Sequence, residues 1–332
     1  MKTITRNWVV TGLIFCAAVL FTVFCGLGIA NMSRQEPTDA SVDPTEPAVS
    51  SSEAPVTSSS APETSQEPET DVPESSTADP DQSAGKIRLL SEEEQNAIYE
   101  KYPDIPQEFK ISGERDEQNR PASAVDFAEA FALKYKRVRV FSPQTRSDVS
   151  LIFILSQEFG YTDDVLDILK DRKIRATFFV DWAYLQSNPT IIERILLEKH
   201  ELGTLGASNP DNGIGLYGVR DVMNDFYGFN QHIEDVYDRT VTKAFLNYDM
   251  FKDTTVVELT QMGYEVIFYS ASYDDNRPSK DIDASAYLQS LELQAHKGAI
   301  YRLHTVNEAT VRMLPEFLNY LSANGYAPGL ID

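Results

Sequence analysis

The fold is decided by residues 150–180, which read SLIFILSQEFGYTDDVLDILKDRKIRATFFV. The stretch begins with an apolar run at 150–155 and ends with a second apolar run at 174–180. Between them, residues 161–172 have the apolar spacing of one face of a helix. Two short buried strands on either side of such a helix form a parallel βαβ unit, so we expect an α/β fold.

The same alternation continues to the C-terminus. We expect further strands at 201–205, 243–247, 264–270 and 298–304. Helices are expected between and after them, at 190–200, 216–238, 254–263, 285–296 and 309–325. About seven strands without a glycine-rich phosphate loop favour a distorted (β/α)7-type barrel over a doubly wound sheet. In such a barrel the functional residues lie at the C-terminal ends of the strands.

The N-terminus predicts a membrane anchor. Residues 8–30 are apolar, and about 23 residues at 1.5 Å each cover the roughly 30 Å hydrocarbon core of a bilayer. Lys2 and Arg6 precede this run and acidic residues follow it, which predicts that 1–7 is cytoplasmic and the C-terminal domain extracytoplasmic. We therefore expect a single-pass protein of the cell membrane. A signal peptide cleaved after residue 30 is the alternative.

Residues 31–85 predict a disordered linker. They are almost entirely Ser, Thr, Pro, Ala, Asp and Glu, with no aromatic residue, and cannot bury apolar area. This segment contains 12 acidic residues and one basic residue, which is half of the net charge of −22. The charge is thus largely a property of the linker, and nucleic-acid binding is not expected. A helical lead-in at 86–146 and a domain at 147–332 follow.

Four short motifs in the C-terminal domain resemble one family. They are YTDDVLDILKDRKIRATFFV at 161–180, HELG at 200–203, MGYEVIFYS at 262–270 and LHTV at 303–306. In this order, and over about residues 148–332, they resemble the polysaccharide deacetylases with NodB homology, above all the peptidoglycan deacetylases of spore-forming bacteria. The resemblance implies hydrolysis of an N-acetyl group on a sugar. It also implies a divalent metal such as zinc, held by one Asp and two His, with an Asp as general base and a His as the acid that protonates the leaving amine.

Several residues that this chemistry would need are absent. By the resemblance, the base and the metal-binding acid correspond to Ile154 and Leu155, the two metal-binding imidazoles to Leu205 and Asn209, and the arginine that orients the base to Leu246. None of these side chains can perform the corresponding role. The chain has four histidines, and no two of them have a metal-binding spacing: His200, His232, His296 and His304. We therefore expect no cofactor and an inactive, degenerate member.

The acid side of the site is retained. By the resemblance, Asp275 corresponds to the acid that follows the strand at 264–270, and His304 corresponds to the histidine that protonates the leaving amine. We interpret both residues as vestigial. The adjacent Asp163 and Asp164 fall at an expected helix start, where carboxylates favour the helix dipole. An active hydrolase with relocated carboxylates is the alternative, with candidates Glu158, Asp181, Asp211 and Asp275.

Two non-catalytic functions fit these expectations. The first is binding of peptidoglycan or another N-acetylated glycan, with stacking aromatic residues on strand-end loops: Tyr217, Tyr227, Tyr248 and Tyr273. The second is a scaffold that binds a protein partner in envelope or sporulation machinery. Both cysteines, Cys16 and Cys25, lie in the apolar N-terminal run, so the outer domain must be held together by its core without disulfides.

Overall fold

A computed structural model describes residues 86–132, 135–143, 149–208, 210, 213–278 and 281–331. The expected membrane anchor and linker lie outside these residues, as do Asn209 and Asp211. Within the described part of the chain, no helix combines the length and apolarity needed to cross a bilayer.

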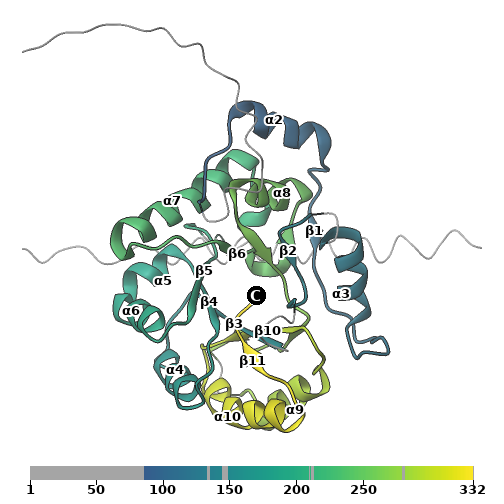
Figure 1. Cartoon of the computed structure of the whole chain (residues 1–332), viewed down its shortest axis with the longest axis vertical. Helices are drawn as coiled ribbons and strands as arrows, with labels where there is room; N and C mark the ends of the chain where they lie inside the picture. The colour runs from purple at the N-terminus through teal and green to yellow at the C-terminus, as the bar shows by residue number, and fades with distance from the viewer. Residues whose placement is uncertain are drawn as a thin grey trace, which may run out of the picture. The chain divides into compact units, whose positions relative to one another are not determined.

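The centre of the domain is a curled, parallel sheet (Figure 1). Its strands follow the order β2-β8-β6-β5-β4-β3-β10-β9, and β11 pairs with β3. The strands are β2 Val138–Arg139, β3 Val149–Leu155, β4 Thr177–Val180, β5 Glu201–Thr204, β6 Lys243–Phe245, β8 Glu265–Ile267, β9 Ala271–Ser272, β10 Ala299–His304 and β11 Pro328–Gly329. The predicted α/β class is confirmed, and the sheet forms a half-barrel.

Helices surround the sheet, as Figure 1 shows. They are α4 Thr162–Asp171, α5 Trp182–Ser187, α6 Pro189–Leu197, α7 Val219–Tyr237, α8 Asp253–Met262, α9 Ala284–Leu293 and α10 Glu308–Ala323. Each except α5 overlaps a predicted helix, and α5 was not predicted. The helix α10 continues through Pro315. Asp163 and Asp164 lie in the first turn of α4, as expected.

The lead-in is helical in part. Helix α2, Glu92–Lys101, begins with a capping box, in which Ser91 and Glu94 bond each other's backbone amides. Helix α3, Ala122–Phe127, is followed by a π-helical turn, Ala128–Ala132, and Val138 already belongs to strand β2, so the predicted lead-in is not helical throughout. A short antiparallel pair joins the lead-in to the domain, formed by β1 Gln107–Glu108 and β7 Met250–Phe251.

The single strand predicted at 264–270 is wrong in extent, because β8 ends at Ile267. After it, the chain changes its hydrogen-bond partners. The Phe268 amide still donates to the Arg139 carbonyl of β2, whereas the Ser270 amide donates to the Ile300 carbonyl of β10. Residues 268–270 thus connect the two ends of the strand order.

Alternate residues of β3 enter two different hydrophobic clusters, as strand geometry requires. Leu151, Phe153 and Leu155 pack with residues of α4, α6 and α10. Ile152 and Ile154 belong to the other cluster. The second cluster also includes residues from α2, α7 and α8.

The carboxyl group of Glu258 is buried among these helices and the sheet. Glu258 of α8 is fully buried, and neither of its carboxyl oxygens makes a well-formed hydrogen bond with a described residue. Burial raises the pKa of Glu258 to about 9, against a smaller opposing effect of the Met223 backbone amide. Glu258 is therefore a protonated, neutral acid at pH 7.

Candidate functional site

A cavity of about 350 Å³ lies at the C-terminal ends of β3 and β10. Its lining comes from the ends of these strands, from the 3-10 turn η3 at Asn247–Asp249, and from the loop after β9. The lining residues are Ile154, Ser156, Gln157, Asn247, Tyr248, Asp249, Asn276, Arg302, His304 and Val306. This is the edge of the sheet at which a site was predicted.

The predicted acid side is assembled. The His304 Nδ1 lies 2.8 Å from Asp275 Oδ1, and the His304 backbone amide donates to Asp275 Oδ2 at 2.7 Å. A carboxylate can only accept a hydrogen bond, so His304 Nδ1 carries the proton in this contact. Nε2 is the ring nitrogen that takes no part in it. His304 lines the cavity, whereas Asp275 is fully buried behind it.

Asp275 is fixed by two further elements of structure. The Tyr287 hydroxyl of α9 donates to Asp275 Oδ2, and the Asn307 side chain donates to the Asp275 carbonyl at 2.7 Å. Burial, with Asp275 beside it, raises the pKa of Tyr287 well above its usual range, so its hydroxyl remains a donor. Asn307 in turn caps α10 through the Thr310 amide. The acid side is therefore part of the scaffold as well as of the cavity.

Four of the five substituted positions are aliphatic and buried. Ile154, Leu205 and Leu246 lie in one hydrophobic cluster. Leu155 lies in the other, between the sheet and the helices, so the structure does not bring it together with the first three. Asn209, the fifth position, lies outside the described residues.

The donor set does not fit the metal that the family resemblance implies. Hydrocarbon side chains offer no lone pair to a cation, and zinc in proteins is held by Cys, His, Asp or Glu. Among the described residues, no group of three or more such side chains is placed to hold a metal ion. We therefore assign no step of any reaction to a metal in this chain.

An ion pair in the cavity escaped the sequence reasoning. Arg302 Nη1 lies 2.9 and 2.7 Å from the two carboxylate oxygens of Asp249. The guanidinium also lies over the Tyr269 ring, 4.0 Å from its centroid, and the Tyr269 hydroxyl donates to Asp249 at 2.8 Å. An arginine inside the otherwise apolar strand AIYRLH was the available signal, because a cation in a buried strand needs a partner.

The turn that carries Asp249 has an uncommon backbone conformation. Tyr248 and Asp249 are consecutive non-glycine residues with φ of 66° and 58°. Such a conformation costs roughly 1 kcal/mol or more per residue, so neighbouring contacts must offset it. The Arg302 and Tyr269 contacts to Asp249 provide them. They hold Tyr248, with 47% of its surface exposed, at the cavity.

The other predicted aromatic contacts are more scattered. Tyr217 is exposed and follows the short turn Ile214–Leu216. The Tyr273 ring stacks on Tyr287 with centroids 4.5 Å apart. Tyr227 lies within α7, so its predicted position on a loop is wrong. Of the four tyrosines, only Tyr248 lines the cavity.

The carboxylates proposed for a relocated site have other roles. Glu158 accepts hydrogen bonds from the Tyr184 and Thr162 hydroxyls and from the Gly160 amide. Asp181 caps α5 through the Tyr184 amide. Neither lines the cavity that His304 enters, so the structure does not join them to the acid side.

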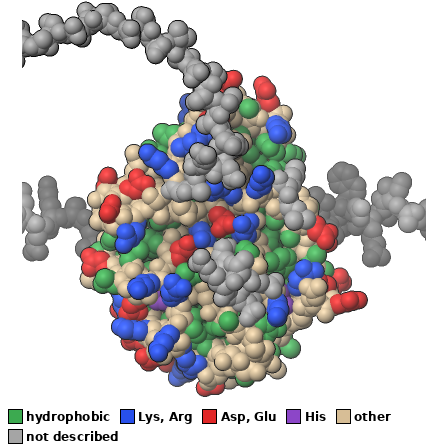
Figure 2. Space-filling model, in the orientation of Figure 1, with side chains coloured by type: hydrophobic (Ala, Val, Ile, Leu, Met, Phe, Trp, Pro, Cys, Tyr) green, Lys and Arg blue, Asp and Glu red, His purple; other side chains and the backbone are tan. Residues whose placement is uncertain are grey.

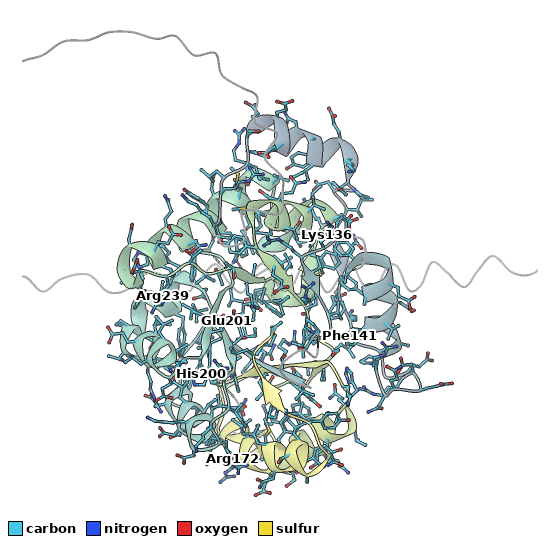
Figure 3. All side chains as sticks on the ribbon, in the orientation of Figure 1. Lys136, Phe141, Arg172, His200, Glu201 and Arg239 are labelled. Atoms are coloured by element: carbon cyan, nitrogen blue, oxygen red, sulfur yellow. The ribbon has the colours of Figure 1, made fainter. Side chains whose placement is uncertain are left out.

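The remaining histidines lie apart from the cavity. His200 precedes β5, at the opposite end of the strands (Figure 3), and its Nδ1 accepts from the Ala176 amide. His296 bonds Ser270 and the Gln294 carbonyl. Burial lowers the pKa of both to about 4, so both are neutral at pH 7. His232 packs on the Trp182 ring.

The visible surface carries mixed charge. Figure 2 shows Lys and Arg side chains interspersed with Asp and Glu on this face of the molecule. The described residues on this face therefore do not form the single basic stripe that is typical of nucleic-acid binding.

Comparisons with known proteins show similarity to polysaccharide deacetylases. Residues 149–267 match the sequence profile of the polysaccharide deacetylases. The chain is 28% identical over 188 residues to the peptidoglycan-N-acetylmuramic acid deacetylase PdaA of Bacillus subtilis, covering 55% of this chain and 70% of that protein. It is 24% identical over 253 residues to the peptidoglycan-N-acetylglucosamine deacetylase PgdA of Listeria monocytogenes, covering 75% of this chain and 53% of that one.

Two solved structures share the fold. Bacillus subtilis PdaA, described as a family 4 carbohydrate esterase, gives a TM-score of 0.61 at 23% identity, covering 69% of this chain and 97% of that one. A Bacillus anthracis protein, described as a CE4 family pseudoenzyme, gives a TM-score of 0.53 at 18% identity, covering 72% of this chain and 92% of that one.

Proposed function

Because the chain carries a polysaccharide deacetylase-like domain related to peptidoglycan deacetylases, we propose that it is a non-catalytic, glycan-binding protein of the cell envelope. One observation carries this proposal. The cavity at the strand ends is open and lined mainly by polar residues, whereas aliphatic side chains stand at Ile154, Leu205 and Leu246, where the family resemblance requires a base, a metal ligand and an arginine.

Hydrolysis of an acetamide requires an activated water and a proton donor for the leaving amine. His304 is suitably placed to donate a proton into the cavity. Asp249, the one carboxylate among the described residues that line the cavity, already accepts from Arg302 and Tyr269. This arrangement supports recognition of a sugar without its hydrolysis. The Bacillus anthracis protein with the same fold is described as a pseudoenzyme, which supports the idea that the scaffold can serve without activity.

The N-terminal sequence supports a location of the proposed protein at the outer side of the cell membrane. Residues 8–30 would anchor the chain in the cell membrane, and 31–85 would hold the domain away from it on the outer side. A flexible linker of this length spans on the order of 40 Å, and like-charge repulsion extends it further. The domain would thus reach glycan strands while it stays attached to the membrane.

The first test separates binding from catalysis. The full chain, purified in detergent, is analysed for bound metal and assayed for acetate release from chitin oligomers and from peptidoglycan. We expect neither stoichiometric metal nor acetate. Tightly bound zinc at one ion per chain, or acetate release that depends on His304, would overturn the non-catalytic proposal in favour of a relocated active site.

The second test concerns the ligand. The full chain is mixed with insoluble peptidoglycan, pelleted and washed, and we expect it in the pellet. Binding should fall in the Tyr248→Ala variant and persist in Tyr217→Ala, since Tyr248 alone of these two lines the cavity. A protein partner that stays bound after the glycan has been digested would favour the scaffold function instead.

A further inference from the structure

The guanidinium of Arg302 has more hydrogen-bond donors than the structure satisfies. It carries five N–H groups. Its hydrogen bonds run from Nη1 to Asp249. Nη2 has no hydrogen-bond partner among the described residues, and Nε, which is buried away from solvent, has none either. Donors at a partly buried position are normally paired, so Nη2 calls for a partner that the described residues do not supply.

Arg302 is also held in a fixed place. The Tyr269 ring lies under the guanidinium and Asp249 lies beside it. The side chain is 17% exposed and lines the cavity together with His304. A cation fixed in this way binds with little loss of side-chain entropy, which strengthens any hydrogen bond that it makes to a ligand.

We infer that Arg302 anchors an oxygen acceptor of the glycan in this cavity, either the carbonyl of an acetamido group or a carboxylate on the sugar. The inference rests on the proposed glycan-binding function and names the group that the cavity recognises. In the register of the sheet, Arg302 is paired with Ile152 and His304 with Ile154. The two side chains therefore come from alternate positions on the same face of β10, and both can contact one substituent of a sugar.

The ligand arm of the experiment uses three probes with the full chain in detergent. Chitotetraose carries acetamido groups only. Peptide-free glycan strands of peptidoglycan add lactyl carboxylates. A fully deacetylated chitosan tetramer has neither acceptor. Calorimetry gives the dissociation constant of each. We expect chitotetraose, the glycan strands or both to bind, and the chitosan tetramer to bind more weakly. If the chitosan tetramer binds as tightly as chitotetraose and the glycan strands, the inference is overturned. Equal affinity for the first two assigns the acetamido carbonyl, and preference for the strands assigns the carboxylate.

The variant arm separates ligand contact from support of the fold. The double change Arg302→Met with Asp249→Asn removes both charges together, so no buried charge is left unpaired. We expect it to weaken binding by about 10- to 100-fold, the usual effect of one or two charge-assisted hydrogen bonds. Asp249→Asn alone should bind a few-fold more tightly, because a neutral amide competes less for the guanidinium.

A matched control changes the exposed Arg277–Asp274 ion pair to Met and Asn, and should leave affinity unaltered. If Asp249→Asn loses as much affinity as the double variant, the ion pair only supports the loop and the inference is overturned. If wild type and double variant bind glycan equally well, the proposed function stands and Arg302 is not the anchor. If the wild type binds none of the probes, both fail.

Discussion

The buried glutamate of α8 leads to a measurable pH dependence. Glu258 has its pKa raised to about 9 in the folded chain, against 4.5 as the reference value. Below pH 4.5 the group is protonated in both states and has no differential effect. As pH rises above 4.5, the unfolded state releases the proton and is favoured, so the stability of the fold declines until about pH 9.

The magnitude follows from the size of the shift. Each pKa unit corresponds to 1.36 kcal/mol, so the loss is about 3 kcal/mol between pH 4.5 and 7 and about 6 kcal/mol by pH 9. A neighbouring acid, Asp221, acts in the same direction. Losses of this size are a large fraction of the stability of an ordinary domain.

Glu258→Gln removes the titration and retains the shape of the side chain. Urea unfolding of the full chain, followed by circular dichroism at several pH values, gives the unfolding free energy of the variant and of wild type. The difference between them should grow by about 3 kcal/mol from pH 4.5 to 7, whatever fixed cost the new amide has. Glu316→Gln, at an exposed position of α10, is the control. A difference that stays constant over this range would refute the reasoning.

Three further predictions concern the site and its surroundings. Asp275→Ala should lower the unfolding free energy by about 2 to 4 kcal/mol, because it leaves the Tyr287 hydroxyl and the His304 amide unpaired, while Asp274→Ala on the surface should cost little in the same melt. Leu155→Asp should reduce stability by several kcal/mol, and by clearly more than Ile154→Asp, because Leu155 packs under the helices and Ile154 borders the cavity; equal losses in urea titrations would contradict this placement. His296 has a pKa lowered to about 4, so it costs the fold about 3 kcal/mol of stability as pH falls from 6.5 to 4, and the loss should be smaller in His296→Gln; an identical acid titration of the two proteins would show that His296 does not titrate in this way.

Much of the fold could be predicted because its elements have strong local signals. The apolar runs of β3 and β4 and the amphipathic spacing of α4 lie within one short stretch, and the capping box of α2 is a local signature. The error at 264–270 has a non-local cause. The sequence YEVIFYS is uniformly suited to a strand, but its second half pairs with different neighbours, and those neighbours are set by how the sheet curls.

The candidate site divides in the same way. Asp275 and His304 were identified because they stand in motifs at strand ends, and their contact needs only that those ends converge. The separation of Leu155 from Ile154 follows from strand alternation, yet sequence reasoning grouped both by their shared correspondence to carboxylates. The Arg302–Asp249 pair joins residues far apart in sequence through a left-handed turn at Tyr248, which no residue type at that position indicated.

The contacts of Asp275 have a consequence for how sequences of this kind are interpreted. One side chain orders the loop after β9, the end of β10 and the packing of α9, and its backbone carbonyl binds the cap of α10. These contacts support the fold whether or not a reaction takes place, so the structural role of the aspartate and of the histidine beside it accounts for their presence. An intact Asp–His pair at these strand ends reports that the scaffold is maintained. Whether this chain catalyses a reaction has to be judged from other residues than this pair.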